Sequence, residues 1–412
     1  MKILLFTQYY TPEPPLRPSD LGTTLAERGH QVMAITGFPC YPKGEIYDGY
    51  PAFGLRQEMI AGVKVLRLPV YPDHSRSAFR RVGYYSSIAL GACLAGPLAG
   101  GGFDAAFVFH PPLTLGIPAV LTHWLRGVPY VYDVQDLWPE SLPATGMINS
   151  PAILNGLSRL ERFNYRHAAA ISVISPGFKQ NLIGKGVPAG KIQVIPNWAD
   201  EGVYRPVPKD PALAEALNMA GRFNIVYGGN MGLPQMLANV IEAAERLQDL
   251  PDLQFVFVGD GVQKPELEET VARKGLRNVR FMSRKTPQEM SSIYALADVL
   301  LIHLRKDPLF AITIPGKTIA YLASGRPILV SVEGDAAEAV TSAGAGVACP
   351  PSDPLALAER VRWLYSLPTE ARERMGECGR QAFLTHYTRK ILVDRFEQLF
   401  ELVSNTEKGK KH

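Results

Sequence analysis

Short apolar runs that alternate with helical stretches constrain the fold of this chain more than any other feature. Ile3–Phe6 is continuously apolar, as a buried parallel strand is, and Val32–Thr36 follows it after a helical stretch at Ser19–Arg28. This alternation is typical of a parallel sheet with helices on both faces. It predicts further strands at Val63–Leu68, Ala105–Phe109, Tyr130–Val134, Ala170–Ile174 and Gln193–Ile195.

The pattern stops at a proline-containing segment, residues 197–219, and then begins again. A strand at Phe223–Tyr227, a glycine-rich loop at Gly228–Pro234 and a helix at Leu237–Leu247 open the second series. Because 412 residues are too many for one compact core, we predict an α/β protein of two tandem doubly wound domains. The remaining predicted strands are Leu253–Val258, Val279–Phe281, Val299–Ile302 and Ile328–Val330.

The predicted domains are residues 1–200 and 201–380, followed by a helical tail at 381–412. Ligands of doubly wound sheets bind beyond the carboxyl ends of the strands, and we expect the two sets of ends to face each other across a cleft. In the tail, spaced apolar residues predict burial, and Lys408, Lys410 and Lys411 predict a frayed basic end.

Composition narrows the function classes. A net charge of +4 does not indicate a nucleic-acid partner, but it is compatible with an anionic substrate or membrane surface. Cys40, Cys93, Cys349 and Cys378 lack metal-ligand spacing and are expected to be buried reduced thiols of a cytoplasmic protein. No signal peptide is expected, because Lys2 runs directly into the first apolar strand.

The most apolar window is Val82–Gly101. Gly, Ala and Ser dilute it, so we interpret it as a packed helix rather than a membrane span. Arg80 and Arg81 precede it, and Tyr84 and Tyr85 could lie at a membrane interface.

The segment Ile314–Leu329 carries the clearest local signal for a ligand. Pro315 and Gly316 break the chain, and Lys317 and Thr318 then open a short helix. Free backbone amides at a helix start, with a lysine beside them, make an anion site, for which phosphate is the usual ligand. The segment has no carboxylate between Pro308 and Pro327 that could hold ribose hydroxyls.

Several segments in this order resemble the retaining glycosyltransferases of the GT-B fold, in family four. They include QDLWPES at Gln135–Ser141, IPNWAD at Ile195–Asp200 and the Pro-Gly-Lys segment, which are similar to those of O-antigen and capsule transferases. These include N-acetyl-fucosaminyl and colanic-acid-type enzymes. Coverage is nearly end to end. The resemblance implies two Rossmann-like domains and a C-terminal helix that returns toward the N-terminal one.

The resemblance also implies an activity. The C-terminal domain would bind a nucleoside-diphosphate sugar, UDP-linked in our expectation, and the N-terminal domain would bind a polyprenyl-diphosphate-linked sugar. A hexose or N-acetyl-amino-deoxyhexose would transfer with retention, without cofactor or metal. Such an enzyme would work in surface-polysaccharide synthesis as a cytoplasmic protein, peripheral on the anionic inner face of the cell membrane.

This chain departs from the family at the donor site. The family's two cations fall on Asn230 and Gln235, and its two glutamates fall on Ile312 and Ala320. We predict that Lys317 stabilises the departing phosphate instead, with Arg284 second and Glu338 binding a hydroxyl. The predicted donor-site residues are Gly229, Asn230, Gly232, Gln235, Arg284, Gly316, Lys317, Thr318 and Glu338.

Each of these donor-site assignments has a plainer alternative. Lys317 could be an exposed helix-start lysine, and the glycine loop could be only a tight turn. Arg305 and Lys306, after another strand, are interpreted as a solvated pair, and Glu338 could be solvated as well.

Asp136 is the first candidate for acting on the acceptor, because it follows the strand Tyr130–Val134 at the carboxyl end that we expect to face the cleft, and Asp133 is the second. We expect front-face displacement, in which Asp136 orients the acceptor or stabilises positive charge on the sugar. The alternative is a helix cap beside Trp138 and Pro139.

Arg17, Asp20 and His110 complete the predicted acceptor site, and Arg17 would bind a phosphate of the acceptor. The alternatives are a surface arginine and a structural histidine.

Two rival functions remain open. The missing cations and glutamates would suit a GT-B-shaped binding or scaffold protein that has lost catalysis. An enzyme that isomerises sugar nucleotides is the other, with His303 as its histidine candidate in the C-terminal domain.

Overall fold

The computed structural model describes every residue except 15–16, 52, 74–77, 145–147, 149 and 410–412. The chain forms two compact units. Unit 1 comprises Met1–Ile174, Phe178–Ile195 and Val393–His412, and unit 2 comprises Ser175–Gly177 and Pro196–Leu392. The last helix, α16 (Arg389–Gly409), therefore begins in unit 2 and continues in unit 1.

Unit 1 is built on an eight-stranded sheet in the order β3-β4-β2-β1-β5-β6-β7-β8. All neighbours pair in parallel except β3, which is antiparallel to β4 at one edge. The strands are β1 (Lys2–Phe6), β2 (Gln31–Gly37), β3 (Arg56–Ile60), β4 (Val63–Leu68), β5 (Ala105–His110), β6 (Tyr130–Val134), β7 (Ala170–Val173) and β8 (Ile192–Val194).

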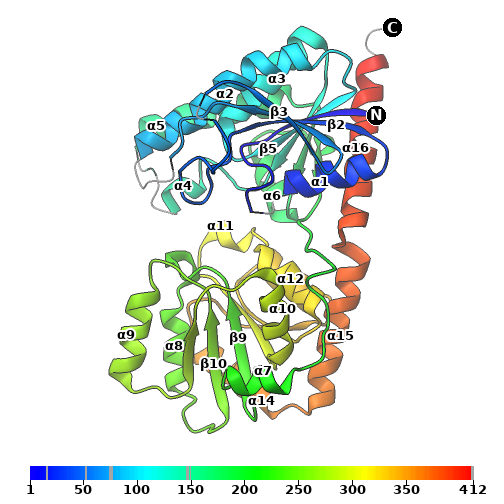
Figure 1. Ribbon diagram of the computed structural model, residues 1–412. Helices are drawn as coiled ribbons and strands as arrows, with labels where there is room; N and C mark the ends of the chain where they lie inside the picture. The colour runs from blue at the N-terminus through cyan, green and yellow to red at the C-terminus, as the bar shows by residue number, and fades with distance from the viewer. Residues whose placement is uncertain (15–16, 52, 74–77, 145–147, 149, 410–412) are drawn as a thin grey trace. The chain divides into compact units, whose positions relative to one another are not determined.

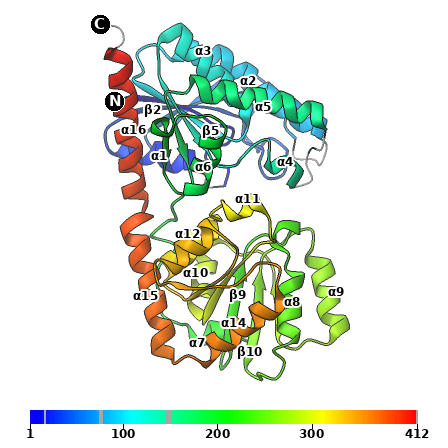
Figure 2. The ribbon, with the colours of Figure 1, turned by 180° about the vertical axis from the view of Figure 1, so that it is seen from behind.

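Helices cover both faces of this sheet, as Figures 1 and 2 show. On one face, α16 packs its aromatic side chains against the strands, and Phe396 meets Phe107 of β5 edge to face, with ring centroids 5.5 Å apart. The helices of unit 1 before α16 are α1 (Arg17–Glu27), α2 (Ala78–Ala99), α3 (Gly116–Arg126), α4 (Ser141–Ala144), α5 (Pro151–His167) and α6 (Pro176–Gly184), with short 3-10 turns η1 (Leu113–Leu115) and η2 (Ala189–Lys191).

Unit 2 has a six-stranded, wholly parallel sheet in the order β11-β10-β9-β12-β13-β14. Its central strands are completely buried, which is why their sequences are mainly apolar, although they also contain buried Asn224, Gln254 and His303. They are β9 (Phe223–Gly228), β10 (Leu253–Val258), β11 (Val279–Met282), β12 (Val299–His303), β13 (Ile328–Ser331) and β14 (Gly346–Ala348).

The helices of unit 2 alternate with these strands, as a doubly wound unit requires. They are α7 (Pro211–Ala216), η3 (Leu233–Gln235), α8 (Ala238–Glu245), α9 (Lys264–Lys274), α10 (Pro287–Leu296), α11 (Pro308–Ala311), α12 (Gly316–Ser324), α13 (Asp335–Thr341), α14 (Pro354–Ser366) and α15 (Thr369–His386). Both units therefore confirm the predicted fold class.

The structure corrects several expectations. The sequence pattern missed the edge strands β3 and β14, and the expected linker contains the helix α7, capped by Asp210. Cys378 is exposed and Cys93 is half-buried, so only two of the four thiols are buried.

The expected membrane-interface tyrosines are also wrong in part. The hydroxyl of Tyr84 lies 3.4 Å from Sγ of Cys40, and the side chain is buried. Tyr85 is half-buried and packs edge to face on Trp138. Arg80 is exposed, whereas the side chain of Arg81 and residues Lys410 and Lys411 lie outside the described part of the chain.

Candidate active site

The glycine-rich loop after β9 is held in place by bonds from three directions. The amide of Gly228 donates to the hydroxyl of Tyr321 (2.9 Å), and the amide of Gly229 donates to the carbonyl of Val258 (2.9 Å). The hydroxyl of Tyr227 donates to the carbonyl of Asn230 (2.6 Å). Gly229 has a φ of 137°, which side chains rarely adopt, so this position requires glycine.

Asn230 and Gln235, the residues at the family's cation positions, bind each other. Oε1 of Gln235 accepts from the amide of Gly232 (3.0 Å) and from Nδ2 of Asn230 (3.3 Å). The carbonyl of Gln235 lies 2.8 Å from Nδ1 of His303, at the end of β12. A carbonyl only accepts, so Nδ1 carries the proton, and burial lowers the pKa of His303 to about 4.

Lys317 is the second residue of α12, and its ammonium nitrogen lies underneath this loop. Nζ is 3.7 Å from the centroid of the Tyr227 ring, and a Cβ placed on Gly229 would lie 3.0 Å from it. Nζ is inaccessible to solvent and has no hydrogen-bond acceptor within the described chain. Burial lowers its pKa to about 7. The alternative of an exposed helix-start lysine is therefore wrong.

Two more buried polar atoms on segments at the carboxyl edge of this sheet lack partners in the described structure. They are Oγ1 of Thr318, in the first turn of α12, and Nε2 of His303. His303 is the last residue of β12, and Lys317 and Thr318 begin α12, which follows β12 in the chain. All three residues therefore belong to the carboxyl edge of the sheet. Buried polar atoms are normally satisfied, so three unpartnered atoms at this edge of the sheet are unusual.

The other predicted donor residues lie on the surface of unit 2. Gly316 is exposed, and a Cβ there would meet nothing within 4 Å. Arg284 is exposed after β11, and Glu338 is exposed in the first turn of α13. Neither makes a side-chain hydrogen bond or ion pair within the described residues. The structure does not bring them to Lys317 by any direct contact it describes.

The expected solvated pair is instead two separate ion pairs. Arg305 lies 3.0 Å from Asp307, and its guanidinium lies 5.5 Å from the centroid of Phe310. The exposed Lys306 lies 3.5 Å from Glu333.

In unit 1, Asp136 keeps some solvent exposure just beyond the carboxyl end of β6. Its Oδ2 accepts from Nε1 of Trp138 at 3.2 Å. Burial raises the pKa of Asp136, although hydrogen bonds from Ser141 and Trp138 oppose that shift. The carboxylate is thus both partly accessible and locally hydrogen-bonded. This geometry is compatible with a role in acting on the acceptor and with a role as a helix cap beside Trp138.

Asp133 and Arg17 form a buried pair instead of facing solvent. Nε of Arg17 lies 3.7 Å from Oδ2 of Asp133, and both side chains are almost wholly buried. Arg17 also donates to the carbonyl of Ile195 (2.8 Å), while Asp133 accepts from Ser172 (2.7 Å) and Gln135 (2.7 Å). A surface position for Arg17 is therefore wrong, and these contacts favour a structural role for both residues.

His110 and Asp20 occupy different environments. His110 is fully buried, stacks on Tyr132, and lies with Nε2 3.0 Å from the carbonyl of Asp136. Burial lowers its pKa to about 3, so it is neutral at physiological pH, as a structural histidine would be. Asp20 is half-buried in the first turn of α1.

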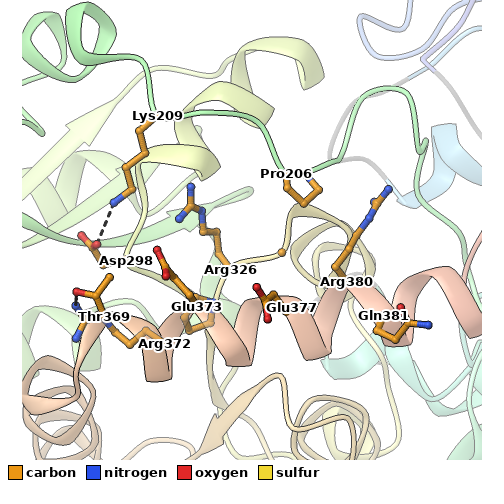
Figure 3. A pocket seen from close by; sticks show the side chains of 12 residues that line it. Pro206, Lys209, Asp298, Arg326, Thr369, Arg372, Glu373, Glu377, Arg380 and Gln381 are labelled. Carbon is orange, nitrogen blue, oxygen red and sulfur yellow. Dashed lines mark hydrogen bonds and ion pairs between the residues drawn. The ribbon is translucent and has the colours of Figure 1, made fainter.

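A pocket of about 360 Å³ in unit 2 lies at the opposite, amino-terminal edge of the sheet (Figure 3). Asp298 and Arg326 lie just before β12 and β13, and Lys209 reaches Asp298 at 3.2 Å. Arg380 donates to backbone carbonyls of Tyr204 and Ala323. Because these charges already serve the fold, and ligands of such sheets bind at the other edge, this pocket is not the donor site.

Sequence reasoning did not find the aromatic residues that shape the carboxyl edge. Tyr227 supplies the ring under Lys317, and Tyr321 holds Gly228. His303 was considered only for an isomerase, whereas here it supports the glycine loop. The position of Tyr227, immediately before the loop, was the available signal.

Comparisons with known proteins agree with this architecture. The chain matches a Glycosyl transferase 4-like domain over residues 17–198 and Glycosyl transferases group 1 over residues 222–366. It is 28% identical to a putative colanic acid biosynthesis glycosyl transferase, WcaI, of Escherichia coli K12, over 90% of this chain and 95% of that protein. It is also 28% identical to a probable glycosyltransferase, WbjE, of Pseudomonas aeruginosa, over 69% of this chain and 71% of that protein.

The crystal structure of HepE of Anabaena in complex with UDP has a similar fold, with a TM-score of 0.69 and 16% identity over 97% of this chain and all of that one. Two matched domains on two doubly wound units define the class of this protein, which is a glycosyltransferase of the GT-B fold. Within that class, the chain belongs to family four, in the O-antigen and capsule subgroup.

Proposed function

We propose that this enzyme transfers a sugar, with retention, from a UDP-sugar to a polyprenyl-diphosphate-linked sugar in surface-polysaccharide synthesis. The name of one relative, a putative colanic acid biosynthesis glycosyl transferase, supports the pathway class, and the name of a second, a probable glycosyltransferase, supports the activity. The UDP complex of the similar HepE structure supports the nucleotide. The enzyme would act in the cytoplasm, at the inner face of the membrane where such acceptors are presented.

The observation that carries the proposal is the unpartnered ammonium of Lys317. An isolated buried charge is costly, and a residue in this state is stabilised by an anion. A diphosphate beside α12 would supply that anion, with the amides of the helix start as further donors. Lys317 would then take the place of the cations that Asn230 and Gln235 do not provide.

Nζ of Lys317 is covered in this structure, so donor binding requires a local movement. Either the loop Gly228–Gln235 lifts or the lysine side chain swings from beneath Gly229. Glycine at 228, 229 and 232 gives this loop the backbone freedom for such a change.

In the proposed reaction, the bond between the anomeric carbon and the phosphate oxygen breaks as the acceptor oxygen attacks from the same face. The acceptor proton passes to the departing phosphate oxygen. Lys317 stabilises the negative charge that develops on this oxygen, and such electrostatic stabilisation usually lowers the activation barrier more than any other effect. Asp136 orients the acceptor or stabilises positive charge on the sugar. No metal is required, because Lys317 and the helix start provide the positive charge.

A catalytically inactive, scaffold-like protein is the second candidate. Its support is specific: Asn230 and Gln235 are tied to each other, and Ile312 and Ala320 stand at the glutamate positions. Such a protein would bind a sugar nucleotide without turning it over.

Thermal denaturation in the presence of UDP-, GDP- and dTDP-sugars tests the donor site. A ligand that binds only the folded state raises the melting temperature, and we expect the UDP-sugars to do so. Lys317→Ala should abolish the shift, whereas Lys306→Ala, at an exposed lysine, should preserve it. An equal shift in both variants would refute the role of Lys317.

UDP release then separates the two candidates. The purified enzyme is supplied with a UDP-sugar that binds and with polyprenyl-diphosphate-linked sugars. Release of UDP that depends on the acceptor supports the transferase, and binding without release across the acceptors supports the scaffold.

A further inference from the structure

The outward side of α2 carries a row of exposed leucines. Leu90, Leu94 and Leu98 recur at a spacing of four residues and are 69%, 73% and 79% exposed. The opposite side of α2 packs into unit 1 through Ile88 and Ala92. The window Val82–Ala99 is long and apolar enough to cross a membrane, but this packing holds the helix along the surface of the sheet.

Topology places α2, α3 and α5 on the same face of the unit 1 sheet. The chain moves from β4 to β5, then to β6, then to β7, always in the same direction along the sheet. Right-handed crossovers then put all three connecting helices on one side. Figures 1 and 2 both show these helices as neighbours, and α3 packs against α2 and α5.

The charges of these helices are almost entirely positive. The sequences of α2 and α3 contain no Asp or Glu, and the single acid of α5, Glu161, is buried and lies 2.6 Å from Lys185. The exposed charged side chains described on this face are Arg80, Arg126, Arg159, Arg162 and Arg166. The three arginines of α5 form no ion pair within the described residues.

Aromatic and apolar side chains extend the surface on both sides of the leucine row. Trp124 of α3 is 60% exposed and packs edge to face on His167 of α5, with ring centroids 5.4 Å apart. On the side of the leucine row away from α3, Leu98 lines a groove of about 660 Å³ together with the exposed Met59 of β3. The charged residues of that groove are Lys2 and Lys64, with His30, and none is acidic.

We propose that the outward face of α2, α3 and α5 is the surface by which this enzyme binds an anionic phospholipid bilayer. The leucine row enters the acyl region, Trp124 lies at the interface, and the arginines meet the lipid phosphates. A second copy of the chain is a poor occupant, because a symmetric contact would bring arginines against arginines. The inference rests on the proposed function, in which the acceptor is anchored in a membrane.

Vesicle flotation tests this surface with the full chain. The vesicles are phosphatidylcholine alone, or phosphatidylcholine mixed with phosphatidylglycerol. We expect binding only to the anionic vesicles. An interfacial arginine contributes about fivefold in affinity, so Arg159→Gln/Arg162→Gln/Arg166→Gln should weaken binding about a hundredfold. Leu90→Ser/Leu94→Ser/Leu98→Ser should abolish it without lowering the melting temperature, because these side chains are exposed.

Matched variants in unit 2 provide the controls. Leu233→Ser/Leu355→Ser changes exposed leucines, and Arg273→Gln/Arg277→Gln changes exposed arginines. Both should bind vesicles like the wild type. Equal binding to neutral vesicles, or unchanged binding by the leucine variant, would overturn the proposal. If that variant instead converts a dimer to a monomer, the face is a protein interface. UDP-sugar thermal shifts, measured without lipid, test the donor site separately.

Discussion

The ammonium nitrogen of Lys317 lies 3.7 Å from the centroid of the Tyr227 ring, and no described hydrogen-bond acceptor reaches it. A ring face attracts a cation, but it does not replace the hydrogen bonds that three N–H donors require. The pKa of Lys317 therefore falls to about 7 through burial. An anion that binds beside Nζ would stabilise its charged form. Without an anion, the buried and unpartnered ammonium lowers the stability of the free enzyme.

Binding of a UDP-sugar should take up a proton. A diphosphate beside Nζ favours the charged form, so the pKa of Lys317 should rise from about 7 on binding. At about pH 8 this corresponds to uptake of about 0.9 of a proton per site. Titration calorimetry in buffers of different ionisation enthalpy measures it. The Lys306→Ala variant should show the same uptake, and a buffer-independent enthalpy for the wild type would contradict the assignment.

Lys317→Met should stabilise the free enzyme while it removes donor binding. The unfolded chain has an ordinary lysine pKa of about 10.4, so between about pH 7 and pH 10 it binds more protons than the folded one. The wild-type free energy of unfolding therefore rises through that window. The variant should be more stable by about 1–3 kcal/mol near pH 7, and its advantage should shrink as the pH rises. Urea denaturation at several pH values measures the unfolding free energies of both proteins. A difference between them that does not change with pH would count against a lowered pKa of Lys317.

Gly229→Ala should damage the donor site more than an ordinary glycine change. The residue has a φ of 137°, and the new methyl would lie 3.0 Å from Nζ of Lys317. We expect a loss of about 1–3 kcal/mol in unfolding free energy together with a large loss of UDP-sugar affinity. Gly184→Ala is the control, because a Cβ there meets nothing within 4 Å. Similar effects of the two changes on affinity would show that the loop geometry is unimportant.

Arg17→Met should lower the free energy of unfolding by about 3–5 kcal/mol, since it leaves Asp133 as an unpaired buried charge. Burial already raises the pKa of Asp133 against the opposing effect of Arg17. Adding Asp133→Asn should recover part of the loss, which a double-mutant cycle in urea quantifies. Arg277→Met, at an exposed arginine, is the control. A stable Arg17→Met protein with weakened acceptor binding would restore the phosphate-binding role.

Asp136→Asn should separate catalysis from donor binding. If the carboxylate orients the acceptor or stabilises the sugar cation, kcat should fall about 100-fold or more, while the UDP-sugar thermal shift stays unchanged. Steady-state UDP release measures kcat. If Asp136 is only a helix cap beside Trp138, the variant should have a lower melting temperature and an unchanged kcat.

The alternation of apolar runs was sufficient to predict the central strands of both sheets, because parallel strands that are buried on both faces consist mainly of apolar residues. The edge strands β3 and β14 escaped prediction, since each is only partly buried and its composition is mixed. Helix α12 and its end at Gly325 followed directly from the sequence, and Gly325 indeed adopts a left-handed φ of 66°.

The sequence by itself determined the two doubly wound units, the helix that begins at the Pro-Gly-Lys turn, and the candidate residues at the ends of the strands. Tertiary structure decided what those residues do. Arg17 meets Asp133, and Lys317 meets Tyr227, only after distant strands pair. Burial and hydrogen-bond satisfaction depend on such distant neighbours, so only the fold could show that the ammonium nitrogen of Lys317 is buried without a hydrogen-bond acceptor in the described structure.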